Sequence, residues 1–236
     1  MLISQIFRLI VRIILPFVGP LRVTGQRNIP KAGPYIVAVN HMSKADPPLV
    51  LIALPGTTLK FFAGEKWERH LIFGPLMRWA GAIYINRGAV DRRALREALH
   101  DLEEGCVFGL APEGTRSRIG KLLPARDGAA YLATRAKVPI LPIGIVNTDQ
   151  IDRNLRRLRR TPIEVRIGKL FQLPEIEKRP KSSELAAYTH YIMIHIAALL
   201  PERHWGYYDD SPALKALIDG EDPWLQCQEY EGVMLE

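Results

Sequence analysis

The residues best suited to chemistry are a histidine and an aspartate five positions apart, His41 and Asp46. An imidazole held by a carboxylate is a general base poised near neutral pH, and it can take a proton from an attacking hydroxyl. Residues five apart are rotated by roughly 140° on a helix, so the two side chains meet only if residues 42–45 fold back as a loop. An N-cap aspartate beside an unrelated loop histidine is the alternative, and the spacing alone leaves both open.

The sequence around this pair indicates a strand before it and a helix after it. Residues 35–39 (YIVAV) have the β-branched and aromatic content of a buried strand. Pro47 and Pro48 favour a helix start, because proline is tolerated in the first helical turn. This assignment places Asp46 at the N-cap of that helix.

A second polar cluster follows an apolar strand at residues 106–110. Its glycine supplies backbone freedom, its hydroxyls can donate hydrogen bonds, and its arginines match phosphate by paired hydrogen bonds. The segment therefore has the makings of an anion cradle, although a glycine turn with solvated charges is the alternative. Its polar members are Glu113, Gly114, Thr115, Arg116, Ser117 and Arg118. Arg87, just past a strand at residues 82–85, is a weaker candidate, because ligands in open α/β sheets bind at strand carboxyl ends but exposed arginines are usually only solvated.

Composition is that of a folded protein with an anionic partner. At 236 residues, 47% hydrophobic and 24% charged, one globular domain with a substantial core is expected. The net charge of +7 favours nucleic acid, anionic lipid or a phosphorylated substrate, and does not choose among them. Cys106 and Cys227 are too few for a disulfide framework, which favours a reducing, cytoplasm-facing environment.

The N-terminal segment, residues 2–18, is apolar except for a narrow polar side that carries Arg8 and Arg12. This pattern is typical of a helix lying in the membrane interface, and the segment is too short and too interrupted to span a bilayer. The alternative is a core helix of an ordinary soluble domain. Residues 16–20 make a poor cleavage site, which argues against a signal peptide. We expect a monotopic or peripheral protein at the cytoplasmic face of the membrane.

Strands and helices alternate along the rest of the chain, which favours an α/β fold with a mixed sheet flanked by helices. Two prolines in the apolar run 138–145 suggest an edge strand or a rigid wall. We divide the chain into a membrane-interface helix (1–19), a single catalytic domain (20–200) and an acidic, aromatic extension (201–236), whose packing the sequence does not decide. Strands are expected at 21–26, 35–39, 59–63, 82–85, 106–110, 140–146 and 163–167, and helices at 47–54, 90–104, 127–136 and 183–200, the last capped by Ser182 or Ser183.

Taken in order, four segments resemble the conserved blocks of the glycerolipid acyltransferase family, whose best-known members are the 1-acylglycerol-3-phosphate acyltransferases. The similarity extends over about residues 20–147. Three features depart from the family pattern. Ala111 stands where the family often has a bulky apolar residue, a single N-terminal helix replaces several spanning ones, and the C-terminal tail has no counterpart. These departures leave the identity of the substrate open. The four segments are residues 40–46, 81–87, 112–117 and 138–142.

The resemblance implies transfer of a fatty acyl group from acyl-CoA or acyl-carrier protein to the free hydroxyl of 1-acylglycerol-3-phosphate, which gives phosphatidic acid in phospholipid biosynthesis. His41 is then the catalytic base and Asp46 its orienting carboxylate, with neither metal nor cofactor. An anionic membrane surface is the expected partner. The residues expected to bind substrate are Arg87, Glu113, Gly114, Thr115, Arg116 and Ser117.

Two alternatives stay open. One is an acyltransferase of the same family acting on another lipid acceptor, such as a lysophospholipid, glycolipid or amino-acid lipid. The other is a non-catalytic, basic membrane- or nucleic-acid-binding protein, although no basic stripe interleaved with aromatics is present. The five arginines of residues 153–160 could dock anionic headgroups or form a solvated loop. His190 and His195 are expected to be core or surface residues, not metal ligands.

Overall fold

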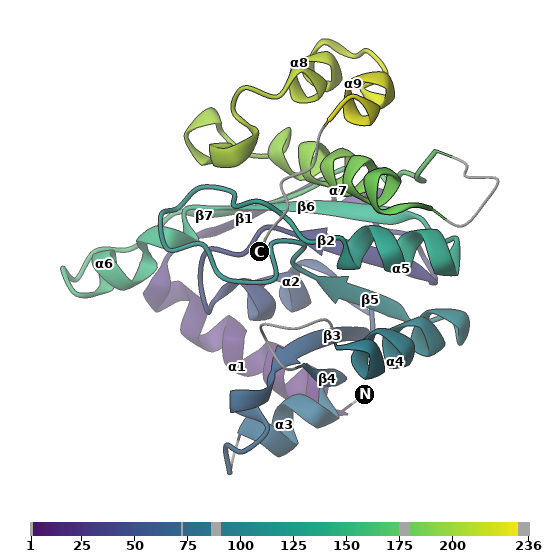
Figure 1. Cartoon of the computed structure of the whole chain (residues 1–236). Helices are drawn as coiled ribbons and strands as arrows, with labels where there is room; N and C mark the ends of the chain where they lie inside the picture. Colours follow the sequence, from purple (N-terminus) through teal and green to yellow (C-terminus); the bar gives the residue numbers. More distant parts are fainter. Residues whose placement is uncertain (1, 72, 86–90, 175–179, 231–236) are drawn as a thin grey trace.

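The computed structural model describes residues 2–71, 73–85, 91–174 and 180–230, and in this part of the chain one seven-stranded sheet organises the fold (Figure 1). The strand order is β1-β7-β6-β2-β5-β3-β4. All neighbouring strands run parallel except β6 and β7, so the sheet is mixed, as predicted. The strands are β1 (Leu21–Thr24), β2 (Tyr35–Val39), β3 (Leu59–Gly64), β4 (Ala82–Ile85), β5 (Val107–Leu110), β6 (Ile140–Val146) and β7 (Ile163–Ile167).

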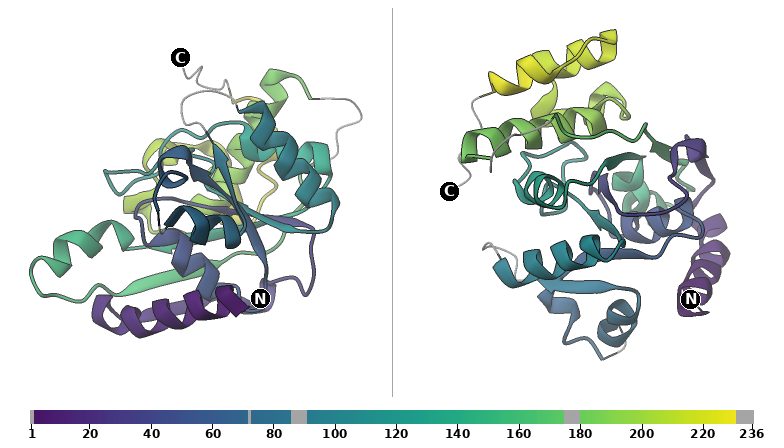
Figure 2. Two further views of the ribbon diagram at one scale, coloured as in Figure 1. Left: turned by 90° about the horizontal axis from the view of Figure 1, so that it is seen from below. Right: turned by 90° about the vertical axis from the view of Figure 1, so that its right-hand side faces the viewer.

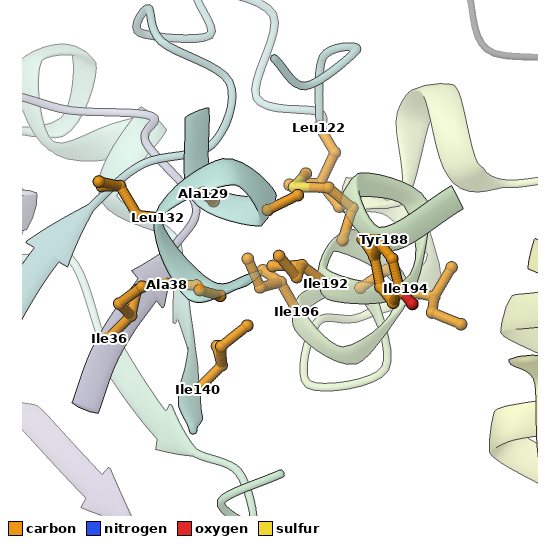
Figure 3. Close-up of a cluster of buried hydrophobic side chains, with 14 of the residues drawn as sticks. Ile36, Ala38, Leu122, Ala129, Leu132, Ile140, Tyr188, Ile192, Ile194 and Ile196 are labelled. Atoms are coloured by element: carbon orange, nitrogen blue, oxygen red, sulfur yellow. The ribbon is translucent and has the colours of Figure 1, made fainter. Parts of the chain in front are cut away.

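Helices cover both faces of the sheet, because successive strand residues point to opposite sides. Tyr35 and Val37 of β2 join the core under α1 (Leu2–Val18) and α2 (Asp46–Ala53). Ile36 and Ala38 join the opposite core, under α4 (Arg92–Glu103), α5 (Gly128–Ala136) and α7 (Ser182–Ala197). Figure 2 shows the two helical layers from further directions, and Figure 3 shows side chains of α5 and α7 meeting those of β2 and β6. Two short helices, α3 (Phe73–Trp79) and α6 (Ile151–Leu155), complete the domain.

The C-terminal extension is a packed layer as far as the structure describes it, up to residue 230. Two helices, α8 (Pro212–Asp219) and α9 (Trp224–Gln228), lie on the outer side of α7 (Figure 1). The rings of Tyr188 in α7 and Trp224 in α9 stack with centroids 4.7 Å apart. Apolar residues of α8 and α9, including Leu214 and Cys227, belong to the same core cluster as α5 and α7.

Two predicted helix caps are wrong. Ala45 is the N-cap of α2, and Asp46 is its first helical residue with a carboxylate that turns back to the preceding loop. In α7 the N-cap is Lys181, whose backbone N–H donates to the carboxylate of Glu184. The helix start is therefore marked by a glutamate at the third helical position that accepts the N–H of the N-cap residue, and neither serine is the cap.

The expectation of an edge position for the proline-containing strand is also wrong. β6 lies between β2 and β7 in the interior of the sheet. Pro142 is tolerated there because it stands where the β6–β7 ladder begins: its carbonyl accepts a hydrogen bond from the Gly168 N–H at 2.9 Å, and the ladder register starts at the next residue, Ile143.

From residue 8 onward, one side of the N-terminal helix α1 packs against the domain. Arg8, expected on the polar side of a membrane helix, is partly buried and donates to the carbonyls of Leu54 and Thr57 at 3.0 and 2.9 Å. The opposite side is exposed and largely apolar: Leu9, Ile10, Ile13, Ile14 and Phe17 are 48–76% exposed, and Arg12 is exposed at its border. Within the described residues, we find no helix with the length and apolarity to cross a bilayer.

Candidate active site

His41 and Asp46 meet at the carboxyl end of β2. Their contact joins Nδ1 of the imidazole to Oδ2 of the carboxylate at 2.9 Å. The same oxygen accepts the backbone N–H groups of Met42 and Ser43, both at 2.7 Å. Residues 42–45 therefore fold back around the carboxylate as the predicted loop. Because Asp46 is only 2% exposed and fixed by three donors, it holds the imidazole in one orientation.

This orientation sets the tautomer of His41. A carboxylate only accepts hydrogen bonds, so the neutral imidazole places its proton on Nδ1 and leaves Nε2 as the free basic nitrogen. The His41 side chain is 18% exposed and lines a cavity beside the pair. A hydroxyl bound in that cavity would meet a base whose position is already set.

The backbone of His41 is held from both neighbouring strands. Its N–H donates to Oε1 of Glu113 at 2.9 Å, and its carbonyl accepts the N–H of Ser117 at 2.8 Å; both partners follow β5. On the other side, the buried amide of Asn40 pairs with the backbone N–H and carbonyl of Ile145 in β6, at 2.7 and 2.9 Å. The base is therefore fixed to the central three strands.

Glu113 lies behind the cavity wall instead of in it. Its side chain is 2% exposed, and its second oxygen accepts the N–H of Leu123 at 2.9 Å. Burial raises the pKa of Glu113 to about 7, although the two backbone hydrogen bonds oppose that rise. Both oxygens are thus engaged by the protein itself. The position of this carboxylate supports a role in positioning His41 in place of the expected contact with substrate.

A cavity of about 780 Å³ opens beside His41, within the range of pockets that hold ligands. Much of its wall is apolar and comes from α2, β3, α3 and β4. Such a wall suits a hydrocarbon chain, because burying apolar surface is favourable. The apolar lining includes Val50, Leu51, Leu59, Phe61, Phe62, Trp67, Met77, Trp79 and Ile85.

Basic side chains also line this cavity. Lys44, Arg116, Arg118 and Arg126 contribute four cations, and Asp46 is the one acidic residue among the described lining residues. Within the described part of the chain, no salt bridge involves these three arginines. The charge they present suits a phosphate group, which arginine can bind through two parallel hydrogen bonds.

The predicted substrate-binding residues divide into three groups. Gly114, Thr115 and Arg116 line the cavity. Glu113 and Ser117 are buried beneath it; the Ser117 side chain is 1% exposed. Arg87 lies outside the described residues. Gly114 has a φ of +66°, and a Cβ there would lie 3.1 Å from the Arg126 side chain, which explains the glycine at this turn.

Three further basic residues, Lys44, Arg118 and Arg126, line the cavity. Arg118 belongs to the anion cradle predicted from the sequence, although it was not among the residues expected to bind substrate. Lys44 and Arg126 carry no such signal, because a loop lysine and a loop arginine are usually solvated. His190 and His195 lie elsewhere: His190 contacts Ser211 at 2.8 Å in the core, and the His195 ring stacks on Phe171.

The loop after β5, which carries Arg116, Arg118 and Arg126, is held by hydrogen bonds to the C-terminal extension. The carbonyl of His204 accepts the N–H of Leu122, and the N–H of Tyr207 donates to the carbonyl of Leu122. The buried Tyr208 hydroxyl accepts the N–H of Ala125 at 3.2 Å. Leu123, between these contacts, donates to Glu113. The extension is thus connected to His41 through the backbone segment 122–125 and the carboxylate of Glu113.

Comparison with known proteins gives three findings. The family model described as Acyltransferase matches residues 20–146, more than half of the chain. A "1-acyl-sn-glycerol-3-phosphate acyltransferase" of Borreliella burgdorferi is 31% identical over 129 residues, 54% of this chain and 51% of that protein. The human "1-acyl-sn-glycerol-3-phosphate acyltransferase alpha" is 33% identical over 135 residues, 52% of this chain and 44% of that protein. The chain spans about half the length of the curated relatives it matches.

A solved structure is similar over a larger part of the chain. It is the crystal structure of the 1-acyl-sn-glycerophosphate acyltransferase from Thermotoga maritima, which is 28% identical and aligns with a TM-score of 0.63. The alignment covers 80% of this chain and 76% of that one. It therefore extends beyond the residues that the family model matches.

Proposed function

The chain belongs to the acyltransferase family, and on that premise we propose that it transfers an acyl group from a thioester to the free hydroxyl of 1-acylglycerol-3-phosphate. The observation that carries the proposal is one cavity lined by His41, by four basic side chains and by a broad apolar wall. A base, an anion site and a hydrocarbon site are the three features that this acceptor and an acyl donor require. The product is phosphatidic acid, a precursor in phospholipid biosynthesis.

In the proposed step, Nε2 of His41 takes the proton of the acceptor hydroxyl as its oxygen attacks the thioester carbonyl carbon. The C–O bond forms, the C–S bond breaks, and the proton passes from His41 to the leaving sulfur, giving the ester and a free thiol. Asp46 stabilises the imidazolium that exists between the two transfers. The acceptor oxygen is the nucleophile, so the reaction requires neither a serine or cysteine nucleophile nor a metal or cofactor.

Charge and apolar surface divide the roles of the other residues. Arg116 and Arg118, with Lys44 and Arg126, hold the phosphate of the acceptor near His41, and Thr115 adds a hydroxyl. The apolar wall around Phe61 and Phe62 receives an acyl chain. The donor is acyl-CoA or acyl-carrier protein, and both present the same thioester to the base.

The substrate is a lipid, so the protein has to work at a membrane surface, which we place at the cytoplasmic face. The exposed apolar side of α1, with Phe17 76% exposed, supports attachment by a helix lying in the interface. Because Arg8 ties α1 to the chain after α2 through Leu54 and Thr57, attachment through α1 would place the domain at the lipid surface.

Release of thiol from acyl-CoA by the purified protein, with and without 1-acylglycerol-3-phosphate, tests the proposal. We expect release that depends on the acceptor, and phosphatidic acid as the product identified by mass spectrometry. Release without acceptor would indicate a thioesterase instead. A larger rate with a lysophospholipid that bears a bulky headgroup would reassign the acceptor, and no release from acyl-CoA or acyl-carrier protein would contradict the proposal.

A further inference from the structure

A short basic segment, residues 151–160, projects from the domain; it consists of α6 and the turn that follows it, and we call it the hairpin. Residues 151–160 contain five arginines and one aspartate, so five minus one gives +4 of the chain's net charge of +7. All five arginines are exposed: Arg153, Arg156, Arg157, Arg159 and Arg160. Within the described residues, none of them forms a salt bridge. Figure 1 and the left view of Figure 2 show α6 extending beyond the rest of the fold.

The tip of the hairpin also exposes apolar side chains. Leu158 is 96% exposed and Leu155 is 42% exposed. Leu158 has a φ of +53°, a conformation that leucine rarely adopts. The turn therefore presents large apolar side chains between cations. This combination suits a surface that carries negative charge and is apolar beneath it.

The backbone of the hairpin is closed by its own hydrogen bonds. The carbonyl of Asn154 accepts the N–H groups of Arg157 and Arg159 at 2.9 and 2.8 Å, and the N–H of Leu158 donates to Leu155 at 3.0 Å. At the base, the Asn154 side chain donates to Thr161 Oγ1 at 3.0 Å. The arginines and leucines are therefore held on a turn whose backbone is fixed by hydrogen bonds.

The hairpin has a defined place relative to the cavity and to α1. The hairpin follows β6, which runs parallel to β2. It therefore begins near the carboxyl ends of these strands, where His41 also lies. At its other end, the N–H of Thr161 donates to the carbonyl of Val18, the last residue of α1, at 2.8 Å. The hairpin thus lies beside the end of the helix whose apolar side is exposed.

We propose that residues 151–160 are a second membrane contact, in which the arginines bind the phosphates of anionic lipid headgroups and Leu155 and Leu158 enter the interface. The charge is complementary to the lipid surface, and arginine matches phosphate geometry. The hairpin contains no aromatic residue on which nucleic-acid bases could stack, so lipid is the partner it fits better. This contact rests on the proposed function, because an enzyme that acts on a lipid acceptor has to attach to the membrane that contains it.

Cosedimentation with vesicles tests this contact without requiring activity. Wild-type protein is compared with the triple variant Arg156→Gln, Arg157→Gln, Arg159→Gln on phosphatidylcholine vesicles with and without phosphatidylglycerol. Each arginine near an anionic surface is worth about fivefold in affinity, so we expect the triple variant to bind anionic vesicles of the order of a hundredfold more weakly. Leu158→Ser should weaken binding to both kinds of vesicle.

A matched control removes three exposed arginines from the other side of the domain: Arg92→Gln and Arg96→Gln in α4 and Arg135→Gln in α5. It changes the net charge equally, and we expect it to keep most of the vesicle affinity. Equal weakening by the two triple variants would overturn the proposal in favour of a general charge effect. Unchanged binding by the hairpin variant would overturn it too, and so would a DNA fragment that binds more tightly than the vesicles and through the same arginines.

Activity separates this contact from the proposed function. With a short-chain acceptor dissolved as monomers, the hairpin variant should keep wild-type turnover, and it should lose turnover only on acceptor embedded in anionic vesicles. Equal loss on both acceptors would overturn the proposal. If the wild type has no acyltransferase activity on any acceptor, the proposed function fails, whereas the vesicle-binding comparison still decides whether the hairpin is a lipid contact.

Discussion

Glu113 Oε1 accepts the backbone N–H of His41 at 2.9 Å, although the two residues are 72 positions apart. The carboxylate holds the base by its main chain, while Asp46 holds it by its side chain. The other oxygen of Glu113 binds the loop at Leu123, and that loop is held in turn by the C-terminal extension. The position of the base is therefore set by three parts of the chain that are remote in sequence.

Replacing the orienting carboxylate should impair chemistry more than folding. Asp46→Asn keeps an oxygen that can accept the N–H groups of Met42 and Ser43, but it removes the negative charge beside the imidazole. We expect kcat to fall at least about a hundredfold, because the imidazolium loses its stabilisation. Steady-state kinetics measure the fall, and circular dichroism checks that the fold is kept. A kcat within a factor of two or three of wild type would remove Asp46 from the mechanism.

The arginines of the cavity should act on binding of the acceptor. Arg116→Ala removes a charge-assisted contact to phosphate, and such a contact is worth about 1.5–3 kcal/mol, so the KM for 1-acylglycerol-3-phosphate should rise at least about tenfold. The kcat should change much less. Arg96→Ala in α4, an exposed arginine far from the cavity, is the control and should leave both constants unchanged. An unaltered acceptor KM in Arg116→Ala would exclude this residue from the phosphate site.

Glu113 should make stability depend on pH. Its pKa is raised by burial from 4.5 to about 7, so between these values the folded protein binds more protons than the unfolded chain. The free energy of unfolding should therefore be highest below pH 4.5 as far as this group is concerned, and it should fall as pH rises through 7, by at most about 3 kcal/mol.

Urea unfolding across this range measures the effect. Glu113→Gln should show a weaker decline of stability with pH than the wild type, and it should be less active because its amide can accept only one of the two backbone N–H groups. Glu103→Gln, on the exposed side of α4, should follow the wild-type pH profile. Parallel profiles for the wild type and Glu113→Gln would show that Glu113 titrates normally.

The extension should support catalysis through the loop it holds. Tyr208→Phe keeps a buried ring but removes the hydroxyl that accepts the N–H of Ala125, so it should cost about 1 kcal/mol of stability and lower kcat severalfold with little change in KM. Tyr207→Phe is matched to it, because the Tyr207 hydroxyl contacts only Tyr230 among the described residues at the exposed surface. If both variants keep the wild-type kcat, the extension has no influence on the site.

Much of the fold could be predicted because its signals are local. The strand expected at residues 35–39 from its β-branched and aromatic content is β2, and the helix expected at 90–104 from its apolar spacing is α4, which begins at Arg92 and ends at Glu103. The cap of α2 was wrong because Asp46 has two possible partners, the helix N-terminus and the loop, and the loop contacts that decide between them depend on His41. The interior position of β6 was missed because a proline at the start of a ladder leaves no signal that distinguishes it from a proline at an edge.

In the candidate site, too, the features with local signals could be predicted, and those that depend on contacts between distant segments could not. Its chemistry-bearing loops were found from residue types, and the fold brings the loops after β2 and β5 together because these strands are neighbours. The burial of Glu113 and Ser117 could not be predicted, since a polar residue in a glycine turn usually faces solvent or ligand. Their partners, the backbone groups of His41 and Leu123, become visible only when the loops are folded against each other.

The assignment of His41 as the base is tested most directly by the turnover of His41→Ala in acceptor-dependent thiol release from acyl-CoA, measured beside the wild type at saturating acceptor. General base catalysis is worth about 10²–10⁴-fold, so we expect kcat to fall at least about a hundredfold in a variant that remains folded. A folded His41→Ala protein that retains near wild-type turnover would contradict the assignment of His41 as the base.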